Sequence, residues 1–243
     1  MSRSKEGGGL PSVCILAGGL GTRLGHLVKE QPKALVEVAG EPFVYHQLRA
    51  LADHGARRIV LCVGYLGEQI RALLGPRQFG LDVVYSFDGP SLDGTLGAIR
   101  RAAPLLEDRF LVLYGDTLLT IDYSAFVAGW WGSGLGAAMA VLKNEGRWGP
   151  SNVTYRDGHV GRYDKHRPTA DMQWIDYGLG GLTKAAMATV PATEKDLSAL
   201  QSELAARHEL YGFEVTERFY EIGSPDALRE TDAYLRSRTS QDG

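Results

Sequence analysis

Apolar and polar positions along the first half of the chain predict strands and helices in turn. Short apolar runs bounded by glycine or polar residues indicate buried strands, and apolar residues at helical spacing indicate helices. In the helix predicted from Phe43 to His54, Phe43, Gln47 and Leu51 form one line and Gly55 follows the end. The expected order is strand Val13–Ala17, helix Phe43–His54, strand Arg58–Val63, helix Glu68–Leu74, strand Leu81–Phe87, helix Thr95–Ala103 and strand Phe110–Tyr114.

The second half of the chain has a different pattern, with a hairpin and fewer helices. Asp157 and Gly158 separate two strand-like runs, which is a strong hairpin signal. Pro225 begins a last helix, for which Ser224 is the expected N-cap. The other expected elements are strands Asn152–Tyr155, His159–Tyr163, Ile175–Leu182 and Phe219–Ile222, and helix Asp196–Arg207.

Strands that alternate with helices indicate β-α-β crossovers. We therefore predict an α/β fold with a Rossmann-like, mostly parallel mixed sheet flanked by helices, extended by a small β-rich lobe. Residues 12–236 are expected to form a single domain, with halves at 12–135 and 136–236. Residues 1–11 are expected to be a flexible leader and residues 237–243 a flexible tail.

Composition narrows the range of partners. The 243 residues carry a formal net charge of -3, which argues against nucleic acid as the main partner. No apolar run is long enough to span a bilayer, and the first residues lack the apolar stretch of a signal peptide, so we expect no membrane partner. Cys14 and Cys62 lie in apolar strands and are expected to be buried thiols, which suits the cytoplasm.

Polar or glycine-rich segments follow three of the predicted strands. They are Gly18–Gly25, Asp88–Gly94 and Gly115–Thr117. In a parallel sheet of this class, ligands bind outside the carboxyl ends of the strands. The sequence therefore predicts a ligand site where these segments converge.

The first segment belongs to the run LAGGLGTRL at residues 16–24, followed by PKALV at 32–36 and GEP at 40–42. A glycine-rich loop after a strand can turn its amides toward a polyphosphate, and Arg23 can form paired hydrogen bonds to phosphate oxygens. Lys33 adds a compact positive charge. A tight loop with surface cations is the structural alternative. Leu24 stands where a dinucleotide-binding motif needs glycine, and no Gly-Lys-Ser/Thr of a P-loop is present.

These motifs resemble the signature of the sugar-1-phosphate nucleotidylyltransferases: Ala-Gly-Gly-x-Gly-Thr-Arg-Leu, then Pro-Lys-x-Leu, then Gly-x-Pro. Weaker similarity extends to about Leu235. The segments LAGGLGTRL, AGEPF and VGYLGEQI are most similar to the corresponding segments of D-glycero-D-manno-heptose-1-phosphate guanylyltransferases. The chain length also suits N-acetylmuramate-1-phosphate uridylyltransferases and short glucose-1-phosphate thymidylyltransferases.

The resemblance implies Mg²⁺-dependent transfer of a nucleoside monophosphate from a nucleoside triphosphate to a sugar 1-phosphate, with release of pyrophosphate. GTP and a heptose or hexose 1-phosphate are the best-matching substrates, although the Asp-Gly pair at residues 93–94 resembles thymidylyl members. Arg23, Lys33 and Lys165 are the implied catalytic residues. The nucleotide is expected to contact Leu16, Ala17, Gly18, Gly19, Gly21, Thr22, Gly94 and Thr95. For the last two, a helix entrance capped by Asp93 or Thr95 is the alternative.

Asp116 directly follows a predicted strand, where a carboxylate suits Mg²⁺, and a turn-forming aspartate is the alternative. The resemblance makes Asp116 a metal ligand and implies a second ligand at Glu221, where the family has aspartate. A surface ion pair with Arg218 is the alternative for Glu221.

The resemblance also implies a sugar site in the second half of the chain. Its residues are Gly149, Asp164, Asp176 and Gly178. Turns at the edge of the core are the structural alternative for Gly149 and for residues 176–178, and an ordinary hairpin charge is the alternative for Lys165.

Two other functions remain open from the sequence. One is the same transfer to phosphocholine or a phosphorylated amino acid, for which an aromatic cage would be a sign. The other is a non-catalytic nucleotide-binding regulatory subunit, against which the presence of Arg23, Lys33 and Asp116 argues. The sequence does not decide between a monomer and a homo-oligomer.

Overall fold

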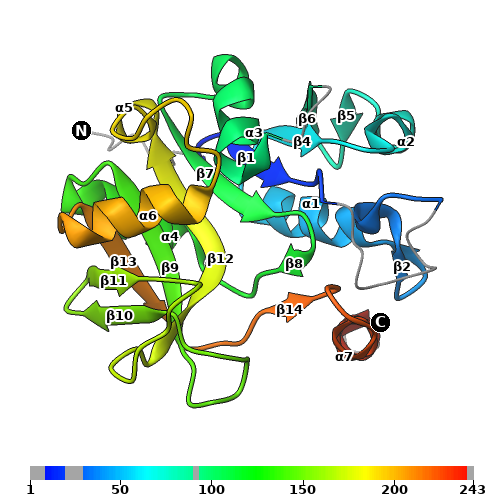
Figure 1. Ribbon diagram of the computed structural model, residues 1–243. Helices are drawn as coiled ribbons and strands as arrows, with labels where there is room; N and C mark the ends of the chain where they lie inside the picture. Colours follow the sequence, from blue (N-terminus) through cyan, green and yellow to red (C-terminus); the bar gives the residue numbers. More distant parts are fainter. Residues whose placement is uncertain (1–8, 20–29, 90–92, 240–243) are drawn as a thin grey trace, which may run out of the picture.

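A ten-stranded mixed sheet forms the centre of the protein (Figure 1). The computed structural model describes residues 9–19, 30–89 and 93–239. The strand order is β10-β11-β13-β9-β12-β7-β1-β4-β6-β5. The strands are β1 (Val13–Leu16), β4 (Arg58–Val63), β5 (Arg77–Gln78), β6 (Leu81–Phe87), β7 (Arg109–Tyr114), β9 (Ala137–Lys143), β10 (Val153–Arg156), β11 (His159–Tyr163), β12 (Trp174–Thr183) and β13 (Leu210–Val215).

The first half of the chain builds the parallel part of this sheet. Strands β7, β1, β4 and β6 are neighbours and run parallel, so their carboxyl ends meet at one edge. The helices are α1 (Phe43–Asp53), α2 (Gly67–Leu74), α3 (Gly94–Ala102), α4 (Tyr123–Ser133), α5 (Lys184–Met187), α6 (Leu197–Ala206) and α7 (Pro225–Thr239), with 3-10 turns η2 (Lys33–Leu35) and η3 (Ala103–Leu105). The elements predicted for this half are confirmed with ends shifted by at most one residue.

The second half extends the sheet with mostly antiparallel strands. Strand β12 lies between β7 and β9 and is antiparallel to both, whereas β9 and β13 are parallel. The predicted hairpin is confirmed as β10 and β11. The predicted α/β fold class, with a mixed sheet extended by a β-rich part, is therefore confirmed. Ser224 caps α7 as expected, because its hydroxyl accepts a hydrogen bond from the amide of Ala227 at 3.2 Å.

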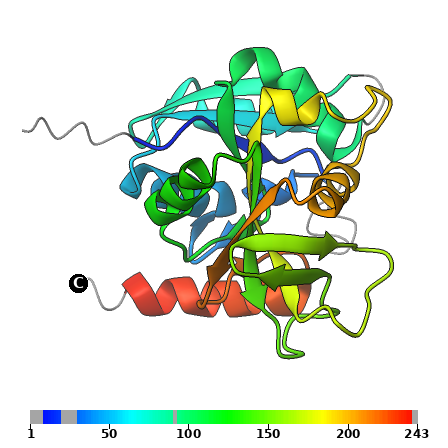
Figure 2. The same cartoon turned by 90° about the vertical axis from the view of Figure 1, so that its left-hand side faces the viewer.

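The sheet buries both of its faces. In β1, Val13 and Ile15 pack into one apolar cluster, and Cys14, which lies between them in the sequence, packs into the other. Helices α1, α2 and α4 cover the first face, and α3, α5 and α6 cover the second. Figure 2 shows α1 and α4 (blue and green) on one side of the sheet and α5 and α6 (yellow and orange) on the other.

The C-terminal segment returns to the first half of the chain. The short strands β8 (Thr117–Leu118) and β14 (Tyr220–Glu221) pair, and so do β2 (Glu37–Val38) and β3 (Glu41–Pro42). Helix α7 lies beside β2 and β14 (Figure 1). Ile222, Val38 and Phe43 share a small third cluster there, which ties the two ends of the domain together. Within the described ranges, no helix combines the length and apolar character needed to cross a membrane.

Candidate active site

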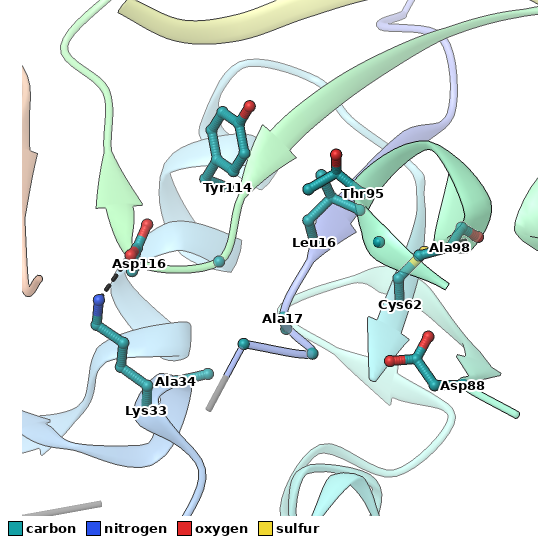
Figure 3. A pocket seen from close by; sticks show the side chains of 14 residues that line it. Leu16, Ala17, Lys33, Ala34, Cys62, Asp88, Thr95, Ala98, Tyr114 and Asp116 are labelled. Atoms are coloured by element: carbon teal, nitrogen blue, oxygen red, sulfur yellow. Dashed lines mark hydrogen bonds and ion pairs between the residues drawn. The ribbon is translucent and has the colours of Figure 1, made fainter. Parts of the chain in front are cut away.

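A cavity of about 470 Å³ opens at the carboxyl edge of β7, β1, β4 and β6 (Figure 3). The three segments that the sequence placed at this edge all contribute to it. The described residues that line it are Leu16, Ala17, Gly18, Gly19, Lys33, Ala34, Cys62, Asp88, Gly94, Thr95, Ala98, Tyr114, Gly115 and Asp116. The cavity thus brings together Lys33, Asp116 and six of the eight residues expected to contact a nucleotide.

An ion pair between Lys33 and Asp116 lies in this cavity, with 2.6 Å between Lys33 Nζ and Asp116 Oδ2 (Figure 3). The Thr117 hydroxyl donates to the other carboxylate oxygen at 3.1 Å. The Lys33 side chain is 13% exposed and that of Asp116 32% exposed, so both are partly withdrawn from water. Lys33 can bind an anionic phosphate, and Asp116 can bind a cation.

Backbone contacts place Asp116 at this position. The amide of Gly115 donates to the Leu16 carbonyl at 2.9 Å, and a Cβ on Gly115 would lie 2.9 Å from that same oxygen. Only glycine lets the end of β7 approach β1 so closely. On the other side, the buried Gln47 amide of α1 donates to the carbonyls of Tyr114 and Thr117, at 2.9 and 2.6 Å. The turn that carries Asp116 is therefore held from two sides.

The start of α3 is fixed by a segment from the second half of the chain. Gly94 has φ +67°, and a Cβ there would lie 2.5 Å from the Lys195 carbonyl oxygen. That oxygen accepts from the Leu96 amide at 2.8 Å, and the Leu197 amide donates to the Thr95 hydroxyl at 2.8 Å. Asp93 occupies the N-cap position without a side-chain capping bond. Packing therefore requires glycine at residue 94, whatever the nucleotide requires.

Arg100 of α3 holds the same segment. Its guanidinium donates to five backbone carbonyls, at distances from 2.5 to 3.3 Å. These carbonyls belong to Met187, Val190, Pro191, Ala192 and Glu194. The loop that ends against the cavity wall at Lys195 is thus organised by one side chain that the sequence analysis did not single out.

The second expected metal ligand lies on the strand next to Asp116. In the antiparallel pair of β8 and β14, Glu221 is opposite Thr117, and the Ile222 amide donates to the Asp116 carbonyl at 3.0 Å. The Oε2 atom of Glu221 lies 2.9 Å from where a Cβ on Gly223 would be, so this carboxylate lies over its own chain. The adjacency of the two backbones is established. A metal shared by the two carboxylates stays a prediction.

Arg218, the alternative partner considered for Glu221, pairs with Glu230 at 2.8 Å. Among the residues that the structure describes, no group of three or more His, Cys, Asp or Glu side chains is arranged to hold a metal ion. Mg²⁺ in nucleotide enzymes is often held by one or two carboxylates together with substrate phosphates, so a smaller protein ligand set is compatible with it.

Asp176 lies behind the main cavity. It lines a small second pocket with Tyr114 and Gly178, and Tyr114 lines both pockets. The Tyr163 hydroxyl donates to one oxygen of Asp176 at 3.0 Å, and the Gly178 amide donates to the other at 2.9 Å. The Asp176 carboxylate therefore already has two internal donors. Its expected contact with a sugar hydroxyl stays a prediction.

The remaining expected sugar residues lie around the outside of these pockets. Lys165 Nζ donates to the Tyr114 hydroxyl at 3.3 Å, so it lies next to the cavity wall. Asp164 accepts from the amides of His166 and Arg167, both at 2.9 Å, and these two bonds hold its pKa below the ordinary range. Gly149 has φ +86°, and its carbonyl accepts from the buried Asn144 at 2.7 Å. Their contacts with a sugar stay predictions.

Not every predicted site residue lies in the described part of the structure, and not every residue that lines the cavity was predicted. Gly21, Thr22 and Arg23 lie outside the described residues. Asp88, Cys62 and Tyr114 line the cavity although the sequence analysis assigned them no role. Tyr114 ends β7, Asp88 directly follows β6 and Cys62 is the last residue but one of β4, and this position at the carboxyl edge of the sheet is the signal that identifies them. Cys14 and Cys62 are buried free thiols, as expected.

Comparison with known proteins gives consistent matches. The family model described as "MobA-like NTP transferase domain" matches residues 13–201. D-glycero-alpha-D-manno-heptose 1-phosphate guanylyltransferase of Aneurinibacillus thermoaerophilus is 30% identical over 233 residues, covering 91% of this chain and 97% of the relative.

Two further relatives agree with these matches. The catalytic subunit beta of mannose-1-phosphate guanylyltransferase from Drosophila melanogaster is 28% identical over 231 residues, and the chain spans 62% of its length. The crystal structure of HddC from Yersinia pseudotuberculosis complexed with GMP-PN has 26% identity and a TM-score of 0.74, covering 93% of this chain and all of HddC.

Proposed function

Because the chain belongs to the family of MobA-like NTP transferase domains, we propose that it transfers a nucleoside monophosphate from a nucleoside triphosphate to a sugar 1-phosphate, releasing pyrophosphate. The observation that carries the proposal is the Lys33–Asp116 ion pair inside a cavity walled by a glycine loop and the start of α3. This arrangement brings together a cation that can bind phosphate and a carboxylate that can bind a metal ion.

The reaction requires the protein to position the two substrates and to balance the negative charge on their phosphates. A sugar phosphate oxygen is already a nucleophile, so no general base is required. The nucleophile must lie in line with the α-phosphorus, and the charge that accumulates on the phosphates must be balanced. Lys33, which lines the cavity, is the proposed contact of the α-phosphate. Lys165, beside Tyr114, is the proposed contact of the sugar phosphate, and Arg23 that of the departing pyrophosphate.

We propose Mg²⁺ as the cofactor. The fit is supported by Asp116, whose carboxylate oxygen lies 2.6 Å from the Lys33 ammonium. Asp116 also lines the cavity and its side chain is 32% exposed, so a cation can reach the carboxylate from the cavity. When bound there, Mg²⁺ would neutralise charge on the two phosphates that react. Asp116 would hold it, and Glu221 on the adjacent strand is the proposed second ligand.

The relatives support GTP as the donor and a heptose or hexose 1-phosphate as the acceptor. The HddC complex with GMP-PN supports a guanine nucleotide in particular. Among the described residues that line the two pockets, Tyr114 is the one aromatic side chain, which does not favour a cage for phosphocholine. The two buried free thiols suit a reducing compartment, and we place the reaction in the cytoplasm.

A pyrophosphate-release screen tests the proposal. Each nucleoside triphosphate is combined with a panel of sugar 1-phosphates, and with phosphocholine as a separate arm. We expect Mg²⁺-dependent turnover with a sugar 1-phosphate. Asp116→Asn should lower turnover at least about tenfold, which corresponds to roughly 1.4 kcal/mol at the transition state. Asp108→Asn, at a carboxylate that is 95% exposed, is the matched control.

Two results would contradict this function. Turnover with phosphocholine and none with any sugar 1-phosphate would assign a different acceptor. Nucleotide binding without turnover across the whole panel would instead favour the non-catalytic regulatory role.

A further inference from the structure

A second hollow, of about 420 Å³, opens at the amino edge of the parallel sheet. Arg58 begins β4 and Arg109 begins β7, and both line this hollow. The active-site cavity is lined from the other ends of the same strands, by Cys62 and Tyr114. Four or five residues at about 3.3 Å each separate the two sites by roughly 15 Å along the strands. The hollow is therefore distinct from the site of the proposed reaction.

Three arginines line this hollow, which we call the arginine hollow: Arg57, Arg58 and Arg109. Most arginines in the described part of the chain pair with an aspartate or glutamate. These three form no such pair with any described residue. Glu107 also lines the hollow, but its carboxylate accepts from the Ser12 amide at 3.1 Å. The hollow thus gathers positive charge in a protein whose formal net charge is -3.

Two of the guanidinium groups are held in place by the protein. Arg58 Nε donates to the Leu105 carbonyl at 3.1 Å, which leaves its two terminal nitrogens to donate to a ligand. The guanidinium carbon of Arg109 lies 5.9 Å from the ring centre of Trp131. Arg57 lies against the chain before β1, because its Nε is 3.7 Å from where a Cβ on Gly9 would be. Planar guanidinium groups bind phosphate oxygens through paired hydrogen bonds, so this set suits a phosphate.

Trp131 adds an aromatic surface to the arginine hollow. This residue is 44% exposed, whereas Trp130 beside it in α4 is fully buried. An exposed indole ring keeps a large apolar area in water, and a planar group stacked on it removes that area from water. A hollow of a few hundred Å³ is also the size that holds a small organic molecule. The phosphate-binding cations and the aromatic ring therefore favour one ligand that carries both groups.

We propose that the arginine hollow binds a small phosphorylated compound with a planar ring. Its phosphate lies among Arg57, Arg58 and Arg109, and its ring stacks on Trp131. Bound phosphate balances the repulsion among the three guanidinium groups, which no described carboxylate balances. The inference goes beyond the proposed function and does not depend on it, because the arginine hollow shares no lining residue with the active-site cavity.

The test follows the indole N–H signal of Trp131 by NMR, with phenyl phosphate as the probe. The chain has four tryptophans, and Trp131→Phe identifies the signal. Phenyl phosphate should shift it saturably, with a Kd on the order of 1 mM, as expected for so small a ligand. Cyclohexyl phosphate, which has the same charge and no aromatic ring, should bind about threefold more weakly. Inorganic phosphate should bind at least about tenfold more weakly.

Arg57→Gln and Arg109→Gln should each raise the Kd of phenyl phosphate at least about fivefold, because each removes a charged donor. Arg57 makes no side-chain hydrogen bond to any described residue, so its substitution keeps the test decisive if Arg109→Gln unfolds. Arg156→Gln, at an exposed ion pair with Asp157, is the matched control and should leave the Kd unchanged. Lys33→Met should also leave it unchanged, because Lys33 lies in the active-site cavity.

Four results would overturn the proposal. The Trp131 signal could show no saturable shift, or the Kd could be the same in Arg57→Gln and the wild-type protein. Equal binding of phenyl and cyclohexyl phosphate would reject the role of the ring. Loss of the shift in Lys33→Met would place the probe in the active-site cavity. A hexaglutamate peptide that shifts the Trp131 signal at lower concentration than phenyl phosphate would instead assign a surface for an acidic protein. Because no nucleotide or sugar phosphate is present, failure of the proposed activity would not alter these readouts.

Discussion

Replacement of Gly94 by alanine tests how the cavity wall is built. Gly94 has φ +67°, and its missing Cβ leaves room for the Lys195 carbonyl, which would lie 2.5 Å from a Cβ. Two costs follow. The left-handed backbone costs a non-glycine residue about 1–2 kcal/mol. The Lys195 carbonyl must also move away, which weakens its 2.8 Å bond to the Leu96 amide and adds about 1 kcal/mol.

Gly134→Ala separates these two costs. Gly134 ends α4 with φ +70°, and a Cβ there would meet no atom within 4 Å. It therefore reports the left-handed backbone cost alone, and any change in unfolded-state entropy is common to both variants. We expect Gly94→Ala to be at least about 1 kcal/mol less stable than Gly134→Ala in urea unfolding, or about 2–4 °C lower in melting temperature.

Equal free energies of unfolding for the two variants would contradict this reasoning, because they would show that the Lys195 segment moves away from the new Cβ without loss of stability. If Gly94→Ala were then selectively impaired in nucleotide binding, the glycine would serve the ligand and not the packing.

Two other substitutions address the same cavity. Arg100→Met should lower stability by about 2–4 kcal/mol in urea unfolding, because five carbonyls lose a partly buried charged donor. Arg229→Met, at an exposed ion pair with Asp226, should change stability by less than about 0.5 kcal/mol. Similar losses in the two variants would contradict the role assigned to Arg100. Lys33→Met should lower kcat at least about tenfold. It should also lower the Mg²⁺ concentration needed for half-maximal activity, because the ammonium no longer competes with Mg²⁺ for the Asp116 carboxylate. A higher Mg²⁺ requirement in this variant would refute the competition.

The sequence predicted the parallel half of the sheet because its signals are local. Each strand there is a short apolar run that ends in glycine or a polar residue, as at Tyr114 and Gly115. The convergence of three segments on one edge follows from the parallel order alone, and the cavity confirms it. The family signature added Lys33 and Asp116 as residues of one site, whereas the ion pair between them was not predicted.

Elements without a local signal were not predicted. Helix α4 carries apolar residues around most of its circumference, including Phe126, Trp130 and Trp131, so it has no amphipathic stripe. Strand β9 is buried on both faces and rich in alanine, so its residues do not alternate. Strand β13 contains a glycine and gives no clear alternation either.

Long-range contacts within the site could not be predicted for a different reason. The bonds from Arg100 to the loop before Lys195 join residues about a hundred positions apart. The family resemblance implied that Glu221 lies near Asp116, but the strand register that sets Glu221 opposite Thr117 is equally long-range. Nothing in the local sequence marks such partners. The Asp88 carboxylate falls in the same class, because its setting depends on the backbones of Gly18 and Gly64.

The position of β12 has a consequence for how the protein can move. Residues 179–183 of β12 pair with residues 109–113 of β7, and the same strand pairs with β9 from Trp174 to Leu182. A rigid-body rotation of residues 136–236 against 12–135 would have to break the pairing of β12 with β7, at a cost of about 1 kcal/mol for each hydrogen bond lost. The β7–β12 pairing therefore opposes a hinge between these two parts of the chain. A ligand that enters the cavity would then meet a surface whose strands all belong to one continuous sheet.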